Sequence, residues 1–289
     1  MQFLLKLLTR IPLPLLYGLG RAIYVLVYYV LRWRVRVAAT NLRNAFPEKS
    51  EAERAAILKA SYRNLGDLVA EVLHGYGATA EDMRARVRFE NAEALTRATE
   101  RGQSVVLLAA HFCNWEWLLL SAGASFEVPI DAVYKRQRVQ FVDRFLREGR
   151  SRFGGHPIPH KRFLFRILRR RGQARAYALV ADQTPLRDEE KHWTRFLNQD
   201  TAFHVGADKI ARVLGAPVLF VAMRRQARGF YSARLDVIAE PPYEPGGGGD
   251  FGAEIIERYA RALEGEIRRN PADWLWIHRK WKYPKPAQG

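Results

Sequence analysis

The stretch that decides the fold is Ser104–Leu120, SVVLLAAHFCNWEWLLL. It opens with an uninterrupted apolar run of strand length, which is typical of a strand buried on both faces of a sheet. A helical pattern starts near Asn114, so His111 and Glu116 flank the junction between strand and helix. The stretch therefore predicts a strand-to-helix unit of an α/β fold, with polar side chains where the strand ends.

Similar patterns recur on both sides of this stretch. Helical spacing over Ser50–Thr99 predicts two or three helices. A final helix is expected over Phe251–Arg269, with Asp250 as its N-cap after the glycine run 246–249. Four further short apolar runs predict strands, with helical patterns between the earlier ones, and they lie at Ile130–Tyr134, Arg175–Ala181, Pro217–Val221 and Tyr231–Ile238. This alternation predicts an α/β sheet.

Composition excludes several classes of protein. Of the 289 residues, 48% are hydrophobic, so the chain can bury a sizeable core, which excludes disorder, collagen and coiled coil. Cys113 is the single cysteine. An intramolecular disulfide, a cysteine-based zinc site and a CxxC redox centre are therefore excluded.

The formal charge of +17 is concentrated in two blocks. Residues 1–44 carry seven basic and no acidic side chains, Val133–Arg175 has a net charge of +12, and the rest of the chain is close to neutral. Two concentrated blocks indicate two surfaces that face negative partners. Nucleic acid, anionic lipid and an acidic carrier protein all fit this charge.

The first block is also apolar over membrane length. Ile11–Leu31 has 21 residues and one charge, Arg21, and about 20 apolar residues cross a bilayer. Arg32, Arg34 and Arg36 follow directly, which argues against a cleaved signal peptide and places the bulk of the chain in the cytoplasm by the positive-inside rule. We expect a membrane anchor that either spans or lies tilted in the bilayer; a buried core helix is the competing interpretation.

His111 and Glu116 are the leading candidates for catalytic residues. With His111 in the loop and Glu116 in the first helical turn the two side chains can meet, and a histidine oriented by a carboxylate is a common general base. The structural alternative is a loop histidine beside a glutamate that interacts with the helix dipole. Asp182 and Gln183 follow another predicted strand at its carboxyl end, where they either position the histidine or substrate, or simply begin a turn.

The sequence gives little support for a catalytic cysteine or a metal site. Cys113 between aromatic residues is typical of simple packing. His156 and His160 are four residues apart, but the prolines between them forbid the helix that would align both on a metal. We expect no metal site, and the P-loop, GxSxG and HExxH motifs do not occur.

The segment HFCNWE resembles the H-x4-D/E motif of the glycerolipid acyltransferase superfamily, in particular the late acyltransferases of lipid A biosynthesis. The order of further matches makes the resemblance specific over nearly the whole chain. These matches are the apolar N-terminus, NLRNAFPE at 41–48, VYKRQRVQFVD at 133–143, GRSRFG at 149–154, ADQTP at 181–185 and WLWIHRKWK at 274–282. The sequence departs from the family in the tyrosine region, where Lys135 replaces arginine and Val139 with Gln140 replaces Asn-Pro.

The resemblance implies a single domain with a mixed, largely parallel sheet flanked by helices over residues 37–289, preceded by a membrane anchor and basic flank over 1–36. It implies His111 as general base with Glu116 holding its imidazole. The supporting or substrate-binding positions that we expect are Arg150, Asp182, Gln183, Tyr134, Lys135 and Asn114. Arg150, or backbone amides after His111, would meet the oxyanion.

The implied reaction moves a fatty acyl chain from acyl carrier protein, or acyl-CoA, to a hydroxyl of a lipid A precursor at the cytoplasmic face of the bacterial inner membrane. No cofactor beyond this co-substrate is expected. The second basic block would attract the acidic carrier, and arginines such as Arg166, Arg169, Arg170 and Arg171 would meet lipid phosphates. Open alternatives are another acceptor (an aminolipid, a lysophospholipid or a lipid-linked pigment), hydrolysis of the donor, and a basic membrane-tethered nucleic-acid-binding protein.

Overall fold

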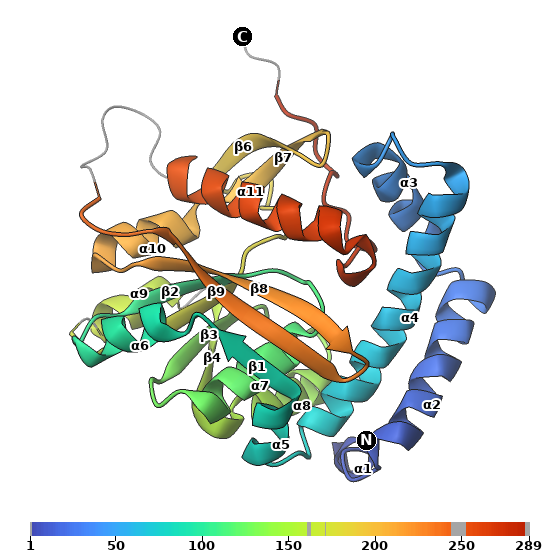
Figure 1. The fold of residues 1–289 in the computed structure, drawn as a ribbon, viewed down its shortest axis with the longest axis horizontal. Coiled ribbons are helices and arrows are strands. Elements are labelled where there is room, and N and C mark those ends of the chain that lie inside the picture. The colour runs from blue at the N-terminus through green and yellow to red at the C-terminus, as the bar shows by residue number, and fades with distance from the viewer. Residues whose placement is uncertain (1, 161–162, 171, 244–252, 287–289) are drawn as a thin grey trace.

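A computed structural model describes residues 2–160, 163–170, 172–243 and 253–286. The N-terminal part is helical, and Figure 1 shows it at one side of the molecule (right). Its elements are α1 (Gln2–Leu8), α2 (Leu13–Val25), the π-helix η1 (Leu26–Val30), α3 (Val35–Ala45) and α4 (Glu51–Gly75). The proposed anchor boundary at residue 36 falls inside α3.

A seven-stranded sheet forms the centre, in the order β1-β9-β8-β2-β5-β3-β4. The strands β8, β2, β5, β3 and β4 run parallel, while β9 is antiparallel to β8 and β1 is parallel to β9. The bounds are β1 Val87–Glu90, β2 Val105–Ala109, β3 Ile130–Tyr134, β4 Gly155–Pro159, β5 Ala176–Val180, β8 Val218–Ala227 and β9 Phe230–Ala239. A separate hairpin joins β6 (Lys191–Phe196) to β7 (Gln199–His204).

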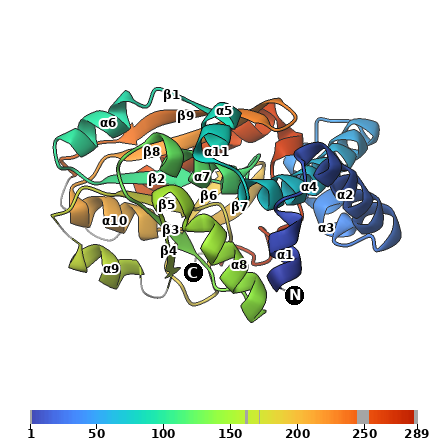
Figure 2. The same cartoon turned by 90° about the horizontal axis from the view of Figure 1, so that it is seen from below.

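Helices cover both faces of this sheet (Figures 1 and 2). In Figure 1, α10 and α11 lie above the sheet, and α5, α7 and α8 lie below it. The bounds are α5 Ala80–Arg86, α6 Glu93–Glu100, α7 Trp115–Ser125, α8 Gln140–Arg150, the 3-10 helix η2 Arg152–Gly154, α9 Phe163–Arg169, α10 Gly206–Leu214, α11 Ala253–Arg269 and the 3-10 helix η4 Pro271–Asp273. The predicted α/β fold with a mixed, largely parallel sheet is confirmed.

All five predicted strands are present, and β3 has the predicted bounds. The sequence analysis missed β4, which contains Pro157 and Pro159. Proline cannot donate a ladder hydrogen bond, so within sheets it occurs mainly in edge strands, and β4 is one of the two edge strands. The glycine run and the expected N-cap Asp250 lie outside the described residues.

Local capping explains where two important helices begin. Ser50 and Glu53 form a capping box at the start of α4, in which the Ser50 amide donates to Glu53 Oε2 at 2.8 Å. Asn114 caps α7, because its Oδ1 accepts from the Trp117 amide at 2.9 Å. The second cap starts α7 three residues after His111.

The apolar N-terminal segment packs along α4. Leu13–Val30 is the single helical stretch of the described residues that is long and apolar enough to cross a membrane, and 22% of it is buried. The two helices approach closely where Gly20 faces Gly66: a Cβ on Gly20 would lie 2.5 Å from the Gly66 carbonyl oxygen. The opposite side of the segment is apolar and exposed, with Leu15, Leu19, Val25, Leu26, Tyr29, Val30, Leu31 and Trp33.

Replacing Gly20 by alanine is therefore expected to destabilise the protein by about 1–3 kcal/mol, because the backbones of α2 and α4 must separate to admit the methyl group. Gly18→Ala is the matched control, since a Cβ there meets nothing within 4 Å and alanine favours the helix. Thermal unfolding of both variants in the same detergent measures the difference. Equal or higher midpoints for Gly20→Ala would contradict the close packing of α2 on α4.

Candidate active site

His111 lies in the loop that follows β2, at the carboxyl edge of the parallel strands. This loop is bonded to the C-terminal segment: the Leu275 amide donates to the His111 carbonyl at 3.1 Å, and the Cys113 amide donates to the Asp273 carbonyl at 2.9 Å. These bonds hold the backbone that carries the imidazole. The His111 side chain keeps 17% of its surface exposed, so a substrate group can reach the ring.

Asp182 holds the imidazole. Strands β2 and β5 are parallel neighbours, with Ala109 opposite Val180, so the residues that follow them meet at one edge. His111 Nδ1 lies 2.7 Å from Asp182 Oδ1, and the His111 amide donates to Oδ2 at 3.1 Å. Trp274 Nε1 donates to the same Oδ2 at 2.9 Å. Asp182 thus accepts three hydrogen bonds within this loop cluster.

These contacts keep Asp182 ionised. Burial alone would raise the pKa of its carboxyl, but the charge and hydrogen bond of His111, with the Trp274 N–H, outweigh burial and lower the pKa to about 2. A carboxylate only accepts hydrogen bonds, so His111 Nδ1 carries the proton in this pair. In the neutral imidazole the lone pair is then on Nε2, the nitrogen that a general base needs free.

The Gln183 side chain is hydrogen-bonded to His111 Nε2. Its Nε2 lies 3.1 Å from His111 Nε2, so the amide N–H donates to the ring lone pair. The expectation that Asp182 and Gln183 position the histidine matches this geometry. Any other group that bonds to His111 Nε2 must take the place of the Gln183 amide.

Glu116 is not the hydrogen-bond partner of His111, which corrects the predicted pairing. Its carboxylate accepts two bonds from Arg150, one of them from Nε at 2.9 Å, and one from the Tyr76 hydroxyl at 3.1 Å. The physical reason is the position of Arg150 at the end of α8, which packs beside α7. The histidine partner comes instead from the neighbouring strand, where Asp182 lies.

Glu116 and Arg150 form an ion pair. Burial would raise the pKa of Glu116, but the bonds and charge of Arg150 lower it, and the charge of His111 contributes in the same direction. Arg150 has five N–H donors and directs two of them to Glu116. The pair of Glu116 and Arg150 is therefore buried and ionised.

The remaining predicted positions are Tyr134, Lys135 and Asn114, which differ in burial and in the residues that they contact. Tyr134, at the end of β3, is buried under the Arg150 guanidinium at 5.9 Å, whereas Lys135 is exposed in the next loop. Asn114 is fully buried; besides capping α7 it donates to Glu71 Oε2 at 2.7 Å. Asn114 therefore supports the loop rather than facing a substrate.

The C-terminal segment contributes groups that the sequence analysis did not single out. Trp274 bonds to Asp182, and Lys280 is buried, donating to the carbonyls of Ala202 at 2.9 Å and Gln183 at 3.3 Å. Burial lowers the pKa of Lys280 to about 7, against the opposing charge of Asp182.

The N-terminal motif contacts this C-terminal segment: Asn41 donates to the carbonyls of Trp276 and His278. The family resemblance includes motifs at 41–48 and 274–282, but the sequence alone does not show that these two segments are in contact.

Two other sequence interpretations concern cysteine and metal. Cys113 is buried, and burial raises the pKa of its thiol well above the usual value, so it is protonated. Within the part of the chain that the structure describes, no group of three His, Cys, Asp or Glu side chains is placed to hold a metal ion.

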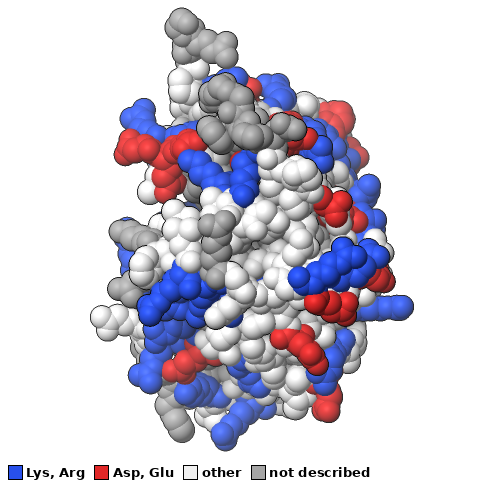
Figure 3. Space-filling model, turned by 90° about the vertical axis from the view of Figure 1, so that its left-hand side faces the viewer, with Lys and Arg blue, Asp and Glu red and all other residues white. Residues whose placement is uncertain are grey.

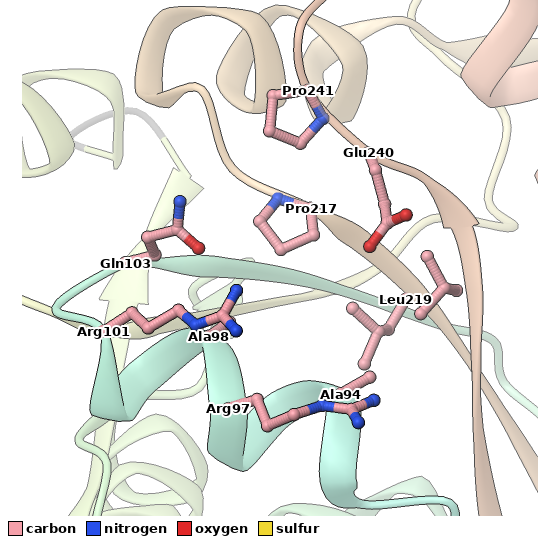
Figure 4. Close-up of a pocket in the computed structure, with 10 residues that line it drawn as sticks. Ala94, Arg97, Ala98, Arg101, Gln103, Pro217, Leu219, Glu240 and Pro241 are labelled. Carbon is pink, nitrogen blue, oxygen red and sulfur yellow. The ribbon is translucent and has the colours of Figure 1, made fainter.

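A groove of about 320 Å³ lies at the opposite edge of the sheet (Figure 4). Arg97 of α6 and Arg101, which follows α6, line one side, and Glu240 lies across from them. Gln103 and Pro217, which precede β2 and β8, place the groove at the amino ends of these strands, far from His111. The groove is separate from the candidate active site.

Known sequences bear on this site. The family described as bacterial lipid A biosynthesis acyltransferase matches residues 1–283. A lipid A biosynthesis palmitoleoyltransferase of Escherichia coli is 28% identical over 280 residues, covering 96% of this chain and 88% of the relative. A lipid A biosynthesis acyltransferase of Shigella flexneri matches equally, and an Escherichia coli lauroyltransferase is 22% identical over 286 residues. The chain therefore belongs to the bacterial lipid A biosynthesis acyltransferase family and is an acyltransferase.

Proposed function

We propose that this enzyme transfers a fatty acyl chain from a carrier-bound thioester to a hydroxyl of a lipid A precursor at the bacterial inner membrane. The observation that carries the proposal is the His111 imidazole, whose Nδ1 is bonded to the Asp182 carboxylate and whose Nε2 is bonded, among the described residues, only to the neutral Gln183 amide, in a side chain that is 17% exposed. This is the arrangement that a general base for a hydroxyl requires.

In the proposed reaction the acceptor hydroxyl displaces Gln183 from His111 Nε2 and gives its proton to that nitrogen. The hydroxyl oxygen attacks the thioester carbonyl, and an oxyanion forms. When it collapses, the carbon–sulfur bond breaks and the leaving thiolate takes the proton from the imidazolium. Asp182 stabilises the imidazolium throughout, because its carboxylate is buried and 2.7 Å from Nδ1.

In the proposed reaction Glu116 and Arg150 stabilise the charges that develop on the imidazole and on the oxyanion. The Glu116 carboxylate adds negative charge near the imidazolium and fixes the Arg150 guanidinium by two hydrogen bonds. The N–H groups of Arg150 that Glu116 does not take would then face the developing oxyanion. Fixing a donor before the reaction removes its reorganisation cost, which favours such an arrangement in a partly buried site.

The N-terminal segment supports a place at the membrane surface. Its exposed side is apolar, and its inner side is held against α4, where Tyr17 donates to the fully buried Glu71 at 2.9 Å. Because one side of the segment is bound to the folded domain, the segment can bury its outer side in lipid without spanning the bilayer. Arg32, Arg34 and Arg36 follow this segment and would lie at the depth of anionic headgroups.

Mass spectrometry of lipid A and total lipids tests the proposal, using cells that lack the gene and cells that carry it again. One acyl chain should disappear from lipid A in the deletion and return with the gene. Loss of a chain from another lipid instead, such as an aminolipid, would reassign the acceptor. An unchanged lipid profile together with free fatty acid release by the purified protein would replace transfer by hydrolysis.

A further inference from the structure

The helix α9 presents an unusual surface. Phe163 and Ile167 are buried and hold the helix on the sheet, where the Phe163 ring meets that of Tyr177. The opposite side carries three large apolar side chains that are exposed by half or more, at 56%, 66% and 50%: Leu164, Phe165 and Leu168. Apolar groups exposed together on a short helix are typical of an interaction site.

Arginines stand between these apolar residues. Arg166 and Arg169 are exposed, and no ion pair joins either of them to a carboxylate within the described ranges. Arg170 and Arg175, by contrast, both bond to the fully buried Asp131, so both guanidinium groups are held by a contact inside the fold. The expected lipid-phosphate cluster thus divides: Arg170 is structural, Arg171 lies outside the described residues, and Arg166 with Arg169 remains for a partner.

We propose that this α9 face, made of Leu164, Phe165, Arg166, Leu168 and Arg169, is the docking surface for the acidic carrier protein that brings the acyl thioester. The inference rests on the proposed function and adds to it the surface by which the donor is recognised. An apolar centre with basic groups around it complements an acidic protein that exposes a small apolar patch.

The position of α9 favours a protein over the membrane. Figures 1 and 2 show α9 at the left end of the molecule and α2 at the right end, and the exposed side of α2 faces away from α4. A flat bilayer that receives α2 therefore does not reach α9. In Figure 3, which looks at the side of α6, α9 and α10, Lys and Arg side chains gather beside uncharged surface.

The start of α9 lies on the active-site side of the sheet, because α9 begins four residues after the carboxyl end of β4. Strands β4, β3, β5 and β2 are consecutive neighbours, so the end of β4 lies three strand spacings, about 14 Å, from the end of β2 where His111 follows. A flexible thioester arm that reaches from the start of α9 to His111 must cover at least this distance.

The test compares two donors with the same acyl chain, acyl carrier protein and coenzyme A. Arg166→Glu with Arg169→Glu should raise the KM for the acyl carrier protein about tenfold or more, since two attractive charges become repulsive. The KM for acyl-CoA and the kcat with either donor should stay within twofold. Arg97→Glu with Arg101→Glu at the end of α6 is the matched control, with the same charge change on exposed arginines, and should leave both KM values unchanged.

A binding measurement separates this inference from the proposed function. Titration of the holo carrier protein without an acyl chain should show weakened binding to the α9 variant and to Phe165→Ser, even if no transfer is ever detected. Equal affinity and equal KM for the wild type and both variants would overturn the docking surface. Loss of binding to anionic phospholipid vesicles in the α9 variant, with carrier affinity unchanged, would overturn it in favour of a membrane contact.

Discussion

His111→Ala is expected to lower the rate of acyl transfer by about 10²- to 10⁴-fold, which is the usual contribution of a general base. The variant removes the Nε2 lone pair that would accept the hydroxyl proton, and leaves the thioester and acceptor contacts of the site in place. The effect should therefore appear mainly in kcat. A coupled assay of thiol release with mass analysis of the lipid product measures it.

His156→Ala is the matched control for this variant, because His156 is an exposed histidine of β4 that faces neither Asp182 nor Glu116. It should retain wild-type kcat and KM. The unfolding midpoint of His111→Ala must also be measured, since Asp182 loses a hydrogen-bond partner there. A folded His111→Ala protein with kcat within threefold of wild type would refute the general-base mechanism.

Asp182→Asn should also reduce kcat by about 10²- to 10⁴-fold, although it changes a single atom type. An asparagine amide can donate to Nδ1, which favours the tautomer whose proton is on Nε2 and so removes the base. The imidazolium would also lose the carboxylate 2.7 Å away. Steady-state kinetics over a pH series measure both effects.

The same variant should change the pH dependence of stability. The folded-state pKa of Asp182 is about 2, below the unfolded value of about 3.9. Its stabilising contribution is therefore complete above about pH 4 and is lost as the pH falls toward 2. Asp182→Asn should be less stable than wild type at pH 7, with a difference that shrinks in acid. A constant difference, or wild-type kinetics, would show that Asp182 does not hold His111.

Much of this picture follows from local sequence. The strand predictions succeeded because buried apolar runs bounded by polar residues have few other structures available, as in Ile130–Tyr134. Polar residues directly after such runs marked His111, Asp182 and Gln183. Glu116 was marked by the same junction as His111 and Arg150 by the family resemblance, and the structure joins these two residues in an ion pair.

What local sequence did not provide is the set of partners. Glu116 is five residues from His111 in the chain, and Asp182 is 71 residues away, yet Asp182 makes the hydrogen bond. Trp274, Tyr76 and Lys280 were missed for the same reason, because each reaches the site from a distant element. The edge strand β4 was missed because its prolines oppose strand formation in isolation.

The sequence by itself determined the α/β class, the apolar N-terminal helix, the basic blocks and the loop that carries His111, since each depends on the periodicity or composition of one continuous segment. Only the tertiary structure decided which carboxylate holds the imidazole, which arginines bond to a carboxylate inside the fold and which stay exposed on α9. The physical reason is that hydrogen bonds and ion pairs depend on distances of about 3 Å between side chains, and the order of strands in the sheet sets those distances.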